Sequence, residues 1–176
     1  MSLIEIGAYA LVCTQQHNLW LYNIYLSMQM PLMVWLVRDL SGSAWLRRSA
    51  LIALPLSIGA LLFEQSVLDV RVDLLAGTAV VNDALLSILF TWVLFEIAGN
   101  EHRPVLRDPR FWVAFAHLLY FGCTLPLTGL LNHLNHRNVA LASQLYVLQD
   151  VIYMFYYGII IWLCTGPLRR WEHHAR

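Results

Sequence analysis

The sequence predicts an all-α polytopic membrane protein, with five long transmembrane helices and a shorter sixth at the N-terminus. Hydrophobic residues make up 59% of the 176 residues and charged residues only 12%, whereas charged residues make up about 25% of an average globular chain. Five apolar stretches are each long enough to cross a bilayer core, which takes about 20 helical residues. No connection between them is long enough for a soluble domain, so residues 1–176 are predicted to form one transmembrane domain.

The predicted helices follow one another with short polar connections. The first segment, residues 2–13, is apolar except for Glu5 and leads into a polar cluster at 14–18. At about 1.5 Å per residue it is short for a bilayer, so it is predicted as the short sixth helix. Asp108 followed by Pro109 is typical of a helix start, with the aspartate as N-cap. The five long spans are predicted at residues 19–37, 49–66, 72–98, 111–131 and 138–164.

The arginines predict the orientation in the membrane. All eleven basic residues are arginine, and basic residues concentrate in cytoplasmic loops. If the connections 38–48 and 99–110 and the C-terminal tail are cytoplasmic, only Arg71 and Arg137 lie outside. We therefore expect a cytoplasmic C-terminus. The formal net charge of zero favours no binding to nucleic acid. The apolar composition makes the lipid bilayer the expected partner.

Polar side chains interrupt the predicted spans at similar depths. Gln29, Asp83 and Asp150 lie about ten to twelve residues from the outer starts of their helices, and helical rise converts these positions into similar heights. Ser57 and His117 fall within about two turns of the same level. Ionisable residues inside a membrane usually face the interior of the bundle or a wet cavity. The matched depths therefore predict a shared polar pocket.

The last span supplies a polar face to this predicted pocket. Tyr146 and Tyr153 lie four residues before and three after Asp150, which places all three on one side of a helix. Tyrosine hydroxyls need hydrogen-bond partners in lipid. We predict a ligand-binding pocket lined by Gln29, Asn82, Asp83, His117, Tyr146, Gln149, Asp150 and Tyr153.

Other interpretations of the same residues stay open. Polar side chains can hold helices together through interhelical hydrogen bonds. Two carboxylates in one pocket would be protonated, share one proton or pair with a protonated His117. Asp83, His117 and Asp150 could hold a metal ion, but they lack a signature spacing, and no metal site is predicted. No common catalytic pattern occurs, so no catalytic residue is predicted, and the sequence identifies no cofactor.

Three short motifs resemble a family of small bacterial membrane proteins. They are HNLWLYNIY at residues 17–25, DPRFW at 108–112 and YFG at 120–122. They are similar to the pattern of an uncharacterised family of polytopic inner-membrane proteins. The resemblance implies a compact bundle of six or seven helices in a bacterial inner membrane, and it implies no activity.

Three classes of function fit these observations. The predicted pocket favours a ligand-binding sensor or signalling module for a small molecule. An accessory subunit of a larger membrane complex would use the same polar residues for assembly with a protein partner or a second copy. A small proton-coupled transporter would use Asp83 and Asp150 as proton sites.

Overall fold

The computed structural model describes residues 19–68, 75–99, 105–134 and 139–165. In this part of the chain all regular structure is helical, which confirms the predicted all-α fold. The elements are α2 (Leu19–Leu40), α3 (Ala44–Val67), α4 (Ala76–Ala98), the short 3₁₀ helix η1 (Val105–Arg107), α5 (Pro109–Leu134) and α6 (Val139–Thr165).

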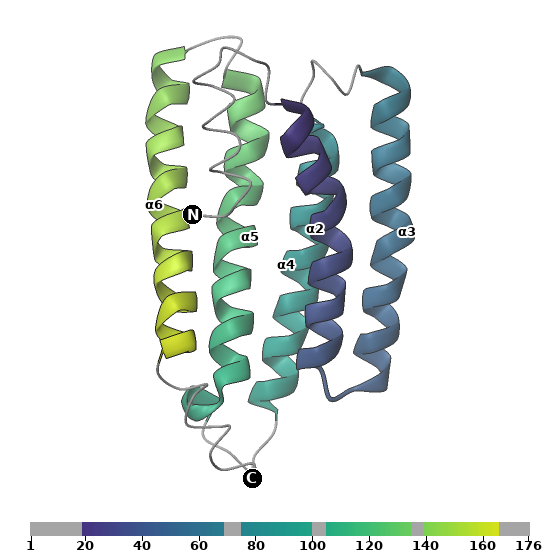
Figure 1. The fold of residues 1–176 in the computed structure, drawn as a ribbon, viewed down its shortest axis with the longest axis vertical. Helices are drawn as coiled ribbons and strands as arrows, with labels where there is room; N and C mark the ends of the chain where they lie inside the picture. Colours follow the sequence, from purple (N-terminus) through teal and green to yellow (C-terminus); the bar gives the residue numbers. More distant parts are fainter. Residues whose placement is uncertain (1–18, 69–74, 100–104, 135–138, 166–176) are drawn as a thin grey trace.

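Successive long helices run in opposite directions, up and down the long axis of the molecule (Figure 1). The short connection between α2 and α3, the 3₁₀ helix η1 and the C-terminal end of α6 all lie at the same end. That end is the one predicted to be cytoplasmic. The alternation follows from the short connections, because a few residues can join only the neighbouring ends of two antiparallel helices.

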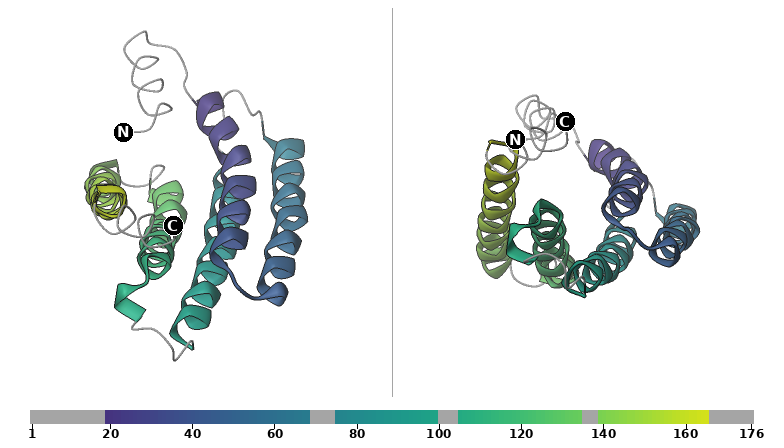
Figure 2. Two further views of the ribbon diagram at one scale, coloured as in Figure 1. Left: turned by 60° about the horizontal axis from the view of Figure 1, so that its bottom comes forward. Right: turned by 90° about the horizontal axis from the view of Figure 1, so that it is seen from below.

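The helices form an open arc when they are seen along the bundle axis (Figure 2, right). α4 is central and packs against α2, α3 and α5, whereas α6 lies at one edge and packs mainly against α5. In the apolar span of α4, 39% of the residues are buried, but only 6% are in the span of α6. Most of the surface of α6 is therefore left uncovered by the other described helices.

Four of the helices in the described part of the chain, α3 to α6, are long and apolar enough to cross a membrane. The predicted count of five long spans and a sixth short one is not matched. α2 is not among the four, because Asn23, Ser27 and Gln29 interrupt its apolar residues. The predicted N-terminal helix, residues 2–13, lies outside the described residues.

The connection between α2 and α3 is shorter than the sequence predicted. Residues 38–48 were expected to be a polar connection, but α2 continues to Leu40 and α3 begins at Ala44, so only three residues join them. Arg47 has a structural reason to be helical, because its Nε and Nη2 donate to the carbonyl oxygen of Ser41 at 3.0 and 2.9 Å. The helix thereby satisfies a backbone acceptor in the turn.

Two glutamates near helix ends accept hydrogen bonds from other segments of the chain. Glu64, in the last turn of α3, accepts the backbone N–H groups of Gly77 and Thr78 at 2.8 and 2.6 Å. These N–H groups lie in the first turn of α4 and have no acceptor within that helix. The α4 N-cap residue, Leu75, makes no side-chain capping hydrogen bond. Glu96 accepts the Gly42 N–H at 2.7 Å and the Ser41 hydroxyl at 2.9 Å. Each carboxylate therefore fixes one end of the bundle.

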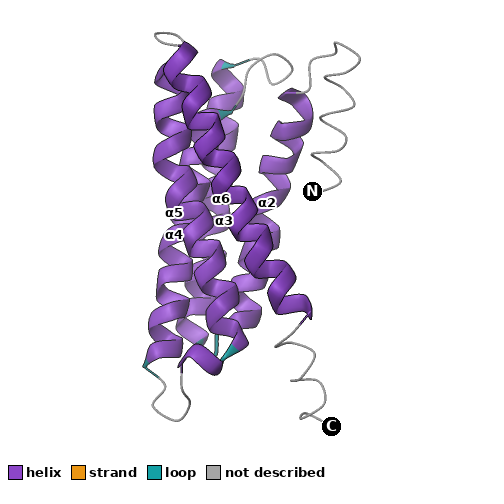
Figure 3. Cartoon of the chain, turned by 90° about the vertical axis from the view of Figure 1, so that its left-hand side faces the viewer, coloured by secondary structure: helices purple, strands orange, loops and turns teal. Residues whose placement is uncertain are grey.

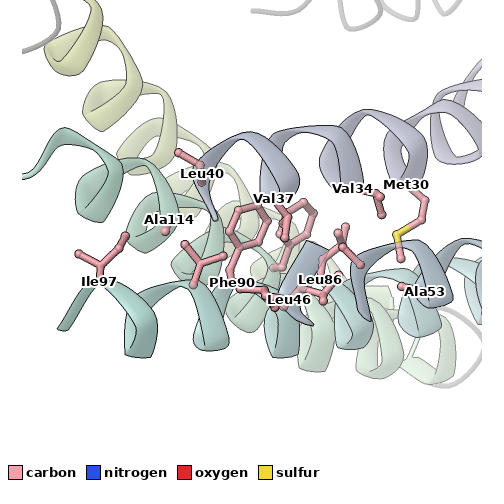
Figure 4. Packing of buried hydrophobic residues seen from close by; sticks show 14 residues of the cluster. Met30, Val34, Val37, Leu40, Leu46, Ala53, Leu86, Phe90, Ile97 and Ala114 are labelled. Atoms are coloured by element: carbon pink, nitrogen blue, oxygen red, sulfur yellow. The ribbon is translucent and has the colours of Figure 1, made fainter. Parts of the chain in front are cut away.

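The main apolar core lies between α2, α3, α4 and α5 (Figure 4). Val37, Phe90 and Leu86 are fully buried there. Ala50 on α3 and Ala114 on α5 are also fully buried, and such small residues let membrane helices approach closely. Exposed apolar side chains surround this core, as expected for a protein whose solvent is lipid.

Candidate functional site

Asn82 joins three helices in the interior of the bundle. The Ser57 hydroxyl on α3 donates to Asn82 Oδ1 at 2.6 Å, and Asn82 Nδ2 donates to the Leu26 carbonyl oxygen on α2 at 3.5 Å. Asn82 is fully buried and Ser57 nearly so. Both hydrogen-bonding ends of the amide are therefore used inside the protein.

Asp83, the next residue on α4, points to α5. The Thr124 hydroxyl lies 3.0 Å from Asp83 Oδ2, and also 2.9 Å from the Tyr120 carbonyl oxygen and 3.3 Å from that of Phe121. A hydroxyl has one hydrogen to donate, so it cannot satisfy all three acceptors at once. A protonated Asp83 could donate to the threonine oxygen and leave the threonine hydrogen for the backbone. The geometry thus accommodates a carboxyl group as well as a carboxylate.

His117 joins α5 to α6. Its Nδ1 lies 2.8 Å from the Val113 carbonyl oxygen and must donate there, because a carbonyl oxygen can only accept. In the neutral ring Nε2 is then an acceptor, and the Tyr156 hydroxyl lies 3.1 Å from it. The imidazole also stacks on Phe90 of α4, with ring centroids 4.9 Å apart. These contacts fix both the tautomer and the orientation of the ring.

Three tyrosines gather beside His117. The Tyr120 ring lies 5.5 Å from that of Tyr153, in a stacked arrangement, and 4.8 Å from that of Tyr156. Gln149 Nε2 donates to the Tyr153 hydroxyl at 2.5 Å. We call Tyr120, Gln149, Tyr153, Tyr156 and His117 the tyrosine cluster. It combines aromatic faces with hydroxyl, amide and imidazole groups.

The remaining predicted pocket residues lie elsewhere. Gln29 is buried on α2. Tyr146 is 47% exposed, and Asp150 is exposed as well. The Asp150 carboxylate makes no hydrogen bond or ion pair with any residue that the structure describes. The eight predicted residues therefore do not line one shared pocket, because Asp83 is enclosed between α4 and α5 while Asp150 faces outward from α6.

The sequence reasoning missed three members of these contacts, Thr124, Tyr120 and Tyr156. The sequence nevertheless contains a spacing that identifies them. Tyr120 and Thr124 lie three and seven residues after His117, and Tyr156 lies three residues after Tyr153. These spacings continue the same helix faces, so extending each predicted polar face along its helix would have found them.

No group of three His, Cys, Asp or Glu side chains within the described residues is arranged to hold a metal ion. Comparison of the chain with protein-family models, curated proteins and solved structures finds no match.

Proposed function

We propose that this protein is a helical membrane subunit that acts by binding another integral membrane protein. The observation that carries the proposal is the exposure of Asp150 on α6, a helix long and apolar enough to span a membrane. The interior polar side chains support it, because Asn82, Asp83 and His117 each contact a neighbouring helix of the same chain. These three side chains hold the helices of the bundle together, whereas Asp150 is available to contact another protein.

The depth of Asp150 makes its exposure costly in lipid. The apolar span of α6 runs from Gln144 to Thr165, and at 1.5 Å per residue Asp150 lies about 9 Å inside its outer end. The short aspartate side chain cannot reach the headgroups from there. A carboxylate costs about 2.5 to 3.5 kcal/mol at a helix centre and less nearer the interface. Coverage by a protein partner would remove this contact with lipid.

The proposal also includes the type of membrane and the orientation of the protein in it. We infer a bacterial inner membrane from the resemblance of the three motifs, and five long spans if α2 crosses together with α3 to α6. The sixth short span would be residues 2–13. A cytoplasmic C-terminus is supported by the arginines, since the connections rich in arginine adjoin one end of the bundle in Figure 1.

Site-specific photocrosslinking tests the proposal. A photoreactive residue at Met154 would report what covers α6, and one at Phe63 on α3 is a matched control, since the two side chains are 73% and 74% exposed. We expect a crosslinked band from Met154 that mass spectrometry identifies as an integral membrane protein, and none from Phe63. Crosslinks only to lipid from both positions would contradict the proposed function.

The tyrosine cluster favours a second candidate function, a ligand-binding sensor. Its hydroxyl, amide and imidazole groups lie beside aromatic faces, a combination that binds small molecules in many proteins. Native mass spectrometry of the detergent-purified protein tests it. A bound small molecule that is lost when Tyr153 and Tyr156 are replaced by phenylalanine would support the sensor. Identical spectra for wild type and this double variant would contradict it.

A further inference from the structure

One face of α6 has the side-chain spacing of a helix–helix interface. Most of α6 is exposed, and one set of its exposed residues follows alternating intervals of three and four, the heptad pattern with which one helix packs along another. In the view of Figure 3, no described helix lies in front of α6. We call these residues the α6 seam: Gln144, Val147, Val151, Met154, Gly158, Ile161 and Thr165.

A shallow groove overlaps the α6 seam and shares Val151, Met154 and Gly158 with it. It has a volume of about 470 Å³ and is lined by Val151, Met154, Phe155, Gly158, Ile159 and Trp162. Its floor includes Gly158, where an added Cβ would meet no other atom within 4 Å. The missing side chain leaves space between larger neighbours, which is the shape that receives a side chain from a packed helix.

Asp150 lies at the edge of the seam. In the heptad register Val151 is an a position, so Asp150 occupies the preceding g position, the place from which charged residues form salt bridges across paired helices. A helix docked in the seam would bring its own flanking residue to this carboxylate. Specificity for the partner would then come from the sign of the charge at that position.

The charge of Asp150 favours a different protein over a second copy of this chain as the occupant of the seam. Two copies in the same membrane orientation, paired along α6, bring residues of equal depth together, and at the depth of Asp150 the second copy offers another Asp150. The chain has no lysine. Among the described residues its arginines lie near helix ends, at Arg38, Arg47, Arg48, Arg107 and Arg110. A second copy therefore brings a like charge to Asp150.

We propose that the α6 seam binds one transmembrane helix of a different protein, and that this helix carries an arginine or lysine facing Asp150. The inference rests on the proposed function and names the chemistry of the partner. The apolar seam and the groove at Gly158 supply the packing, and the paired cation neutralises Asp150. A buried ion pair inside a membrane favours the correct partner because either charge alone would face lipid.

Synthetic transmembrane peptides test this chemistry. The probe is a fluorescent leucine–alanine helix with one arginine at the depth of Asp150, and its control has leucine at that position. Binding to the full-length protein in phosphatidylcholine vesicles is measured by energy transfer. We expect the arginine peptide to bind about tenfold more tightly than the leucine peptide, within the range of polar contacts between membrane helices.

Variants then assign the effect to Asp150. Asp150→Asn should abolish the preference for the arginine peptide, Asp150→Glu should keep it, and Asp150→Arg should favour a peptide with glutamate instead. Asp39→Asn is the matched control, because Asp39 is an exposed carboxylate in the last turn of α2, and it should leave the preference unchanged.

Three results would overturn the inference. The first is equal binding of the arginine and leucine peptides by the wild type. The second is a dimer of twice the chain mass that forms through the seam and is indifferent to Asp150→Asn, because the occupant would then be a second copy. The third is failure of the full-length chain to bind any peptide, as when its own residues 1–18 cover the seam. If a membrane protein still crosslinks to Met154 in the first case, the proposed function stands and only the cation is wrong.

Discussion

The Ser57 hydroxyl and the Asn82 side-chain oxygen lie 2.6 Å apart and join α3 to α4 in the buried middle of the bundle. The sequence placed both residues in one polar layer, and the structure shows them in direct contact. Because Asn82 Nδ2 also donates to the Leu26 carbonyl oxygen, this amide links α2, α3 and α4. It is the strongest candidate for a polar contact that stabilises the fold.

Replacing Asn82 with leucine should destabilise the protein. The change removes both hydrogen bonds and leaves the Ser57 hydroxyl without its partner, so we expect a loss of about 1 to 2 kcal/mol. Thermal unfolding in mild detergent measures it. Ser87→Ala is the control, because the buried Ser87 hydroxyl has no hydrogen-bond partner among the described residues and its removal should be neutral or stabilising. Equal melting temperatures for wild type and Asn82→Leu would show that the amide contributes nothing.

Glu64→Ala should destabilise the start of α4. It leaves the Gly77 and Thr78 N–H groups without their acceptor, and the expected loss is about 2 kcal/mol because hydrogen bonds to a charged group are stronger than neutral ones. Hydrogen exchange at Gly77 and Thr78 should rise more than exchange in α5. Unchanged exchange at these amides would contradict the assignment. Glu64→Gln keeps an acceptor oxygen and should retain part of the protection.

Asp108→Ala should cost about 0.5 to 2 kcal/mol through loss of the N-cap of α5. The predicted cap is confirmed, since α5 begins at Pro109 and Asp108 Oδ1 accepts the Arg110 N–H at 2.9 Å. The same carboxylate pairs with Arg110 Nη2 at 2.8 Å. Asp108→Asn keeps a capping oxygen but loses the charge pair, so its melting temperature should lie between those of wild type and Asp108→Ala. An asparagine variant as unstable as the alanine variant would show that the ion pair matters more than the cap.

His117 should be found as the neutral tautomer with its proton on Nδ1. The Val113 carbonyl oxygen at 2.8 Å requires a donor there, which leaves Nε2 to accept from Tyr156. Nitrogen NMR of ¹⁵N-labelled histidine distinguishes the two ring nitrogens. Tyr156→Phe removes the hydroxyl and should shift the Nε2 signal more than the Nδ1 signal. A proton on Nε2 in the wild type at neutral pH would contradict this geometry.

Cysteine labelling should show the two ends of the bundle on opposite sides of the membrane. In a variant without native cysteines, Val67→Cys should react with an impermeant reagent in intact cells, and Leu106→Cys only after permeabilisation. The two side chains are 71% and 68% exposed and lie at opposite ends of the molecule. The arginine distribution assigns the Leu106 end to the cytoplasm. Labelling of Leu106→Cys from outside would reverse the orientation.

Features that depend on local composition could be predicted from the sequence. Hydropathy predicted an all-α protein with long apolar helices, and the last helix, predicted at 138–164, was found at Val139–Thr165. The start of α5 was predicted from Asp108 and Pro109. A cap and an apolar span are properties of neighbouring residues, so they can be recognised without the rest of the fold. The predicted connection at 38–48 was too long, because α2 runs to Leu40 and Ala44 to Arg48 form the start of α3, where Arg47 donates to the Ser41 carbonyl oxygen.

The contacts between polar residues of different helices depend on how the helices pack, so they could not be predicted from the sequence. Rise along a helix gives the height of a residue, and on that basis Asp83 and Asp150 were predicted to share a pocket. Contact also depends on the rotation of each helix about its axis and on which helices are neighbours. α4 turns Asp83 toward Thr124, whereas α6 lies at the edge of the arc and turns Asp150 outward. The rotation of each helix and the identity of its neighbours depend on how all the helix surfaces pack together. The sequence of one helix carries no information about the surfaces of the others.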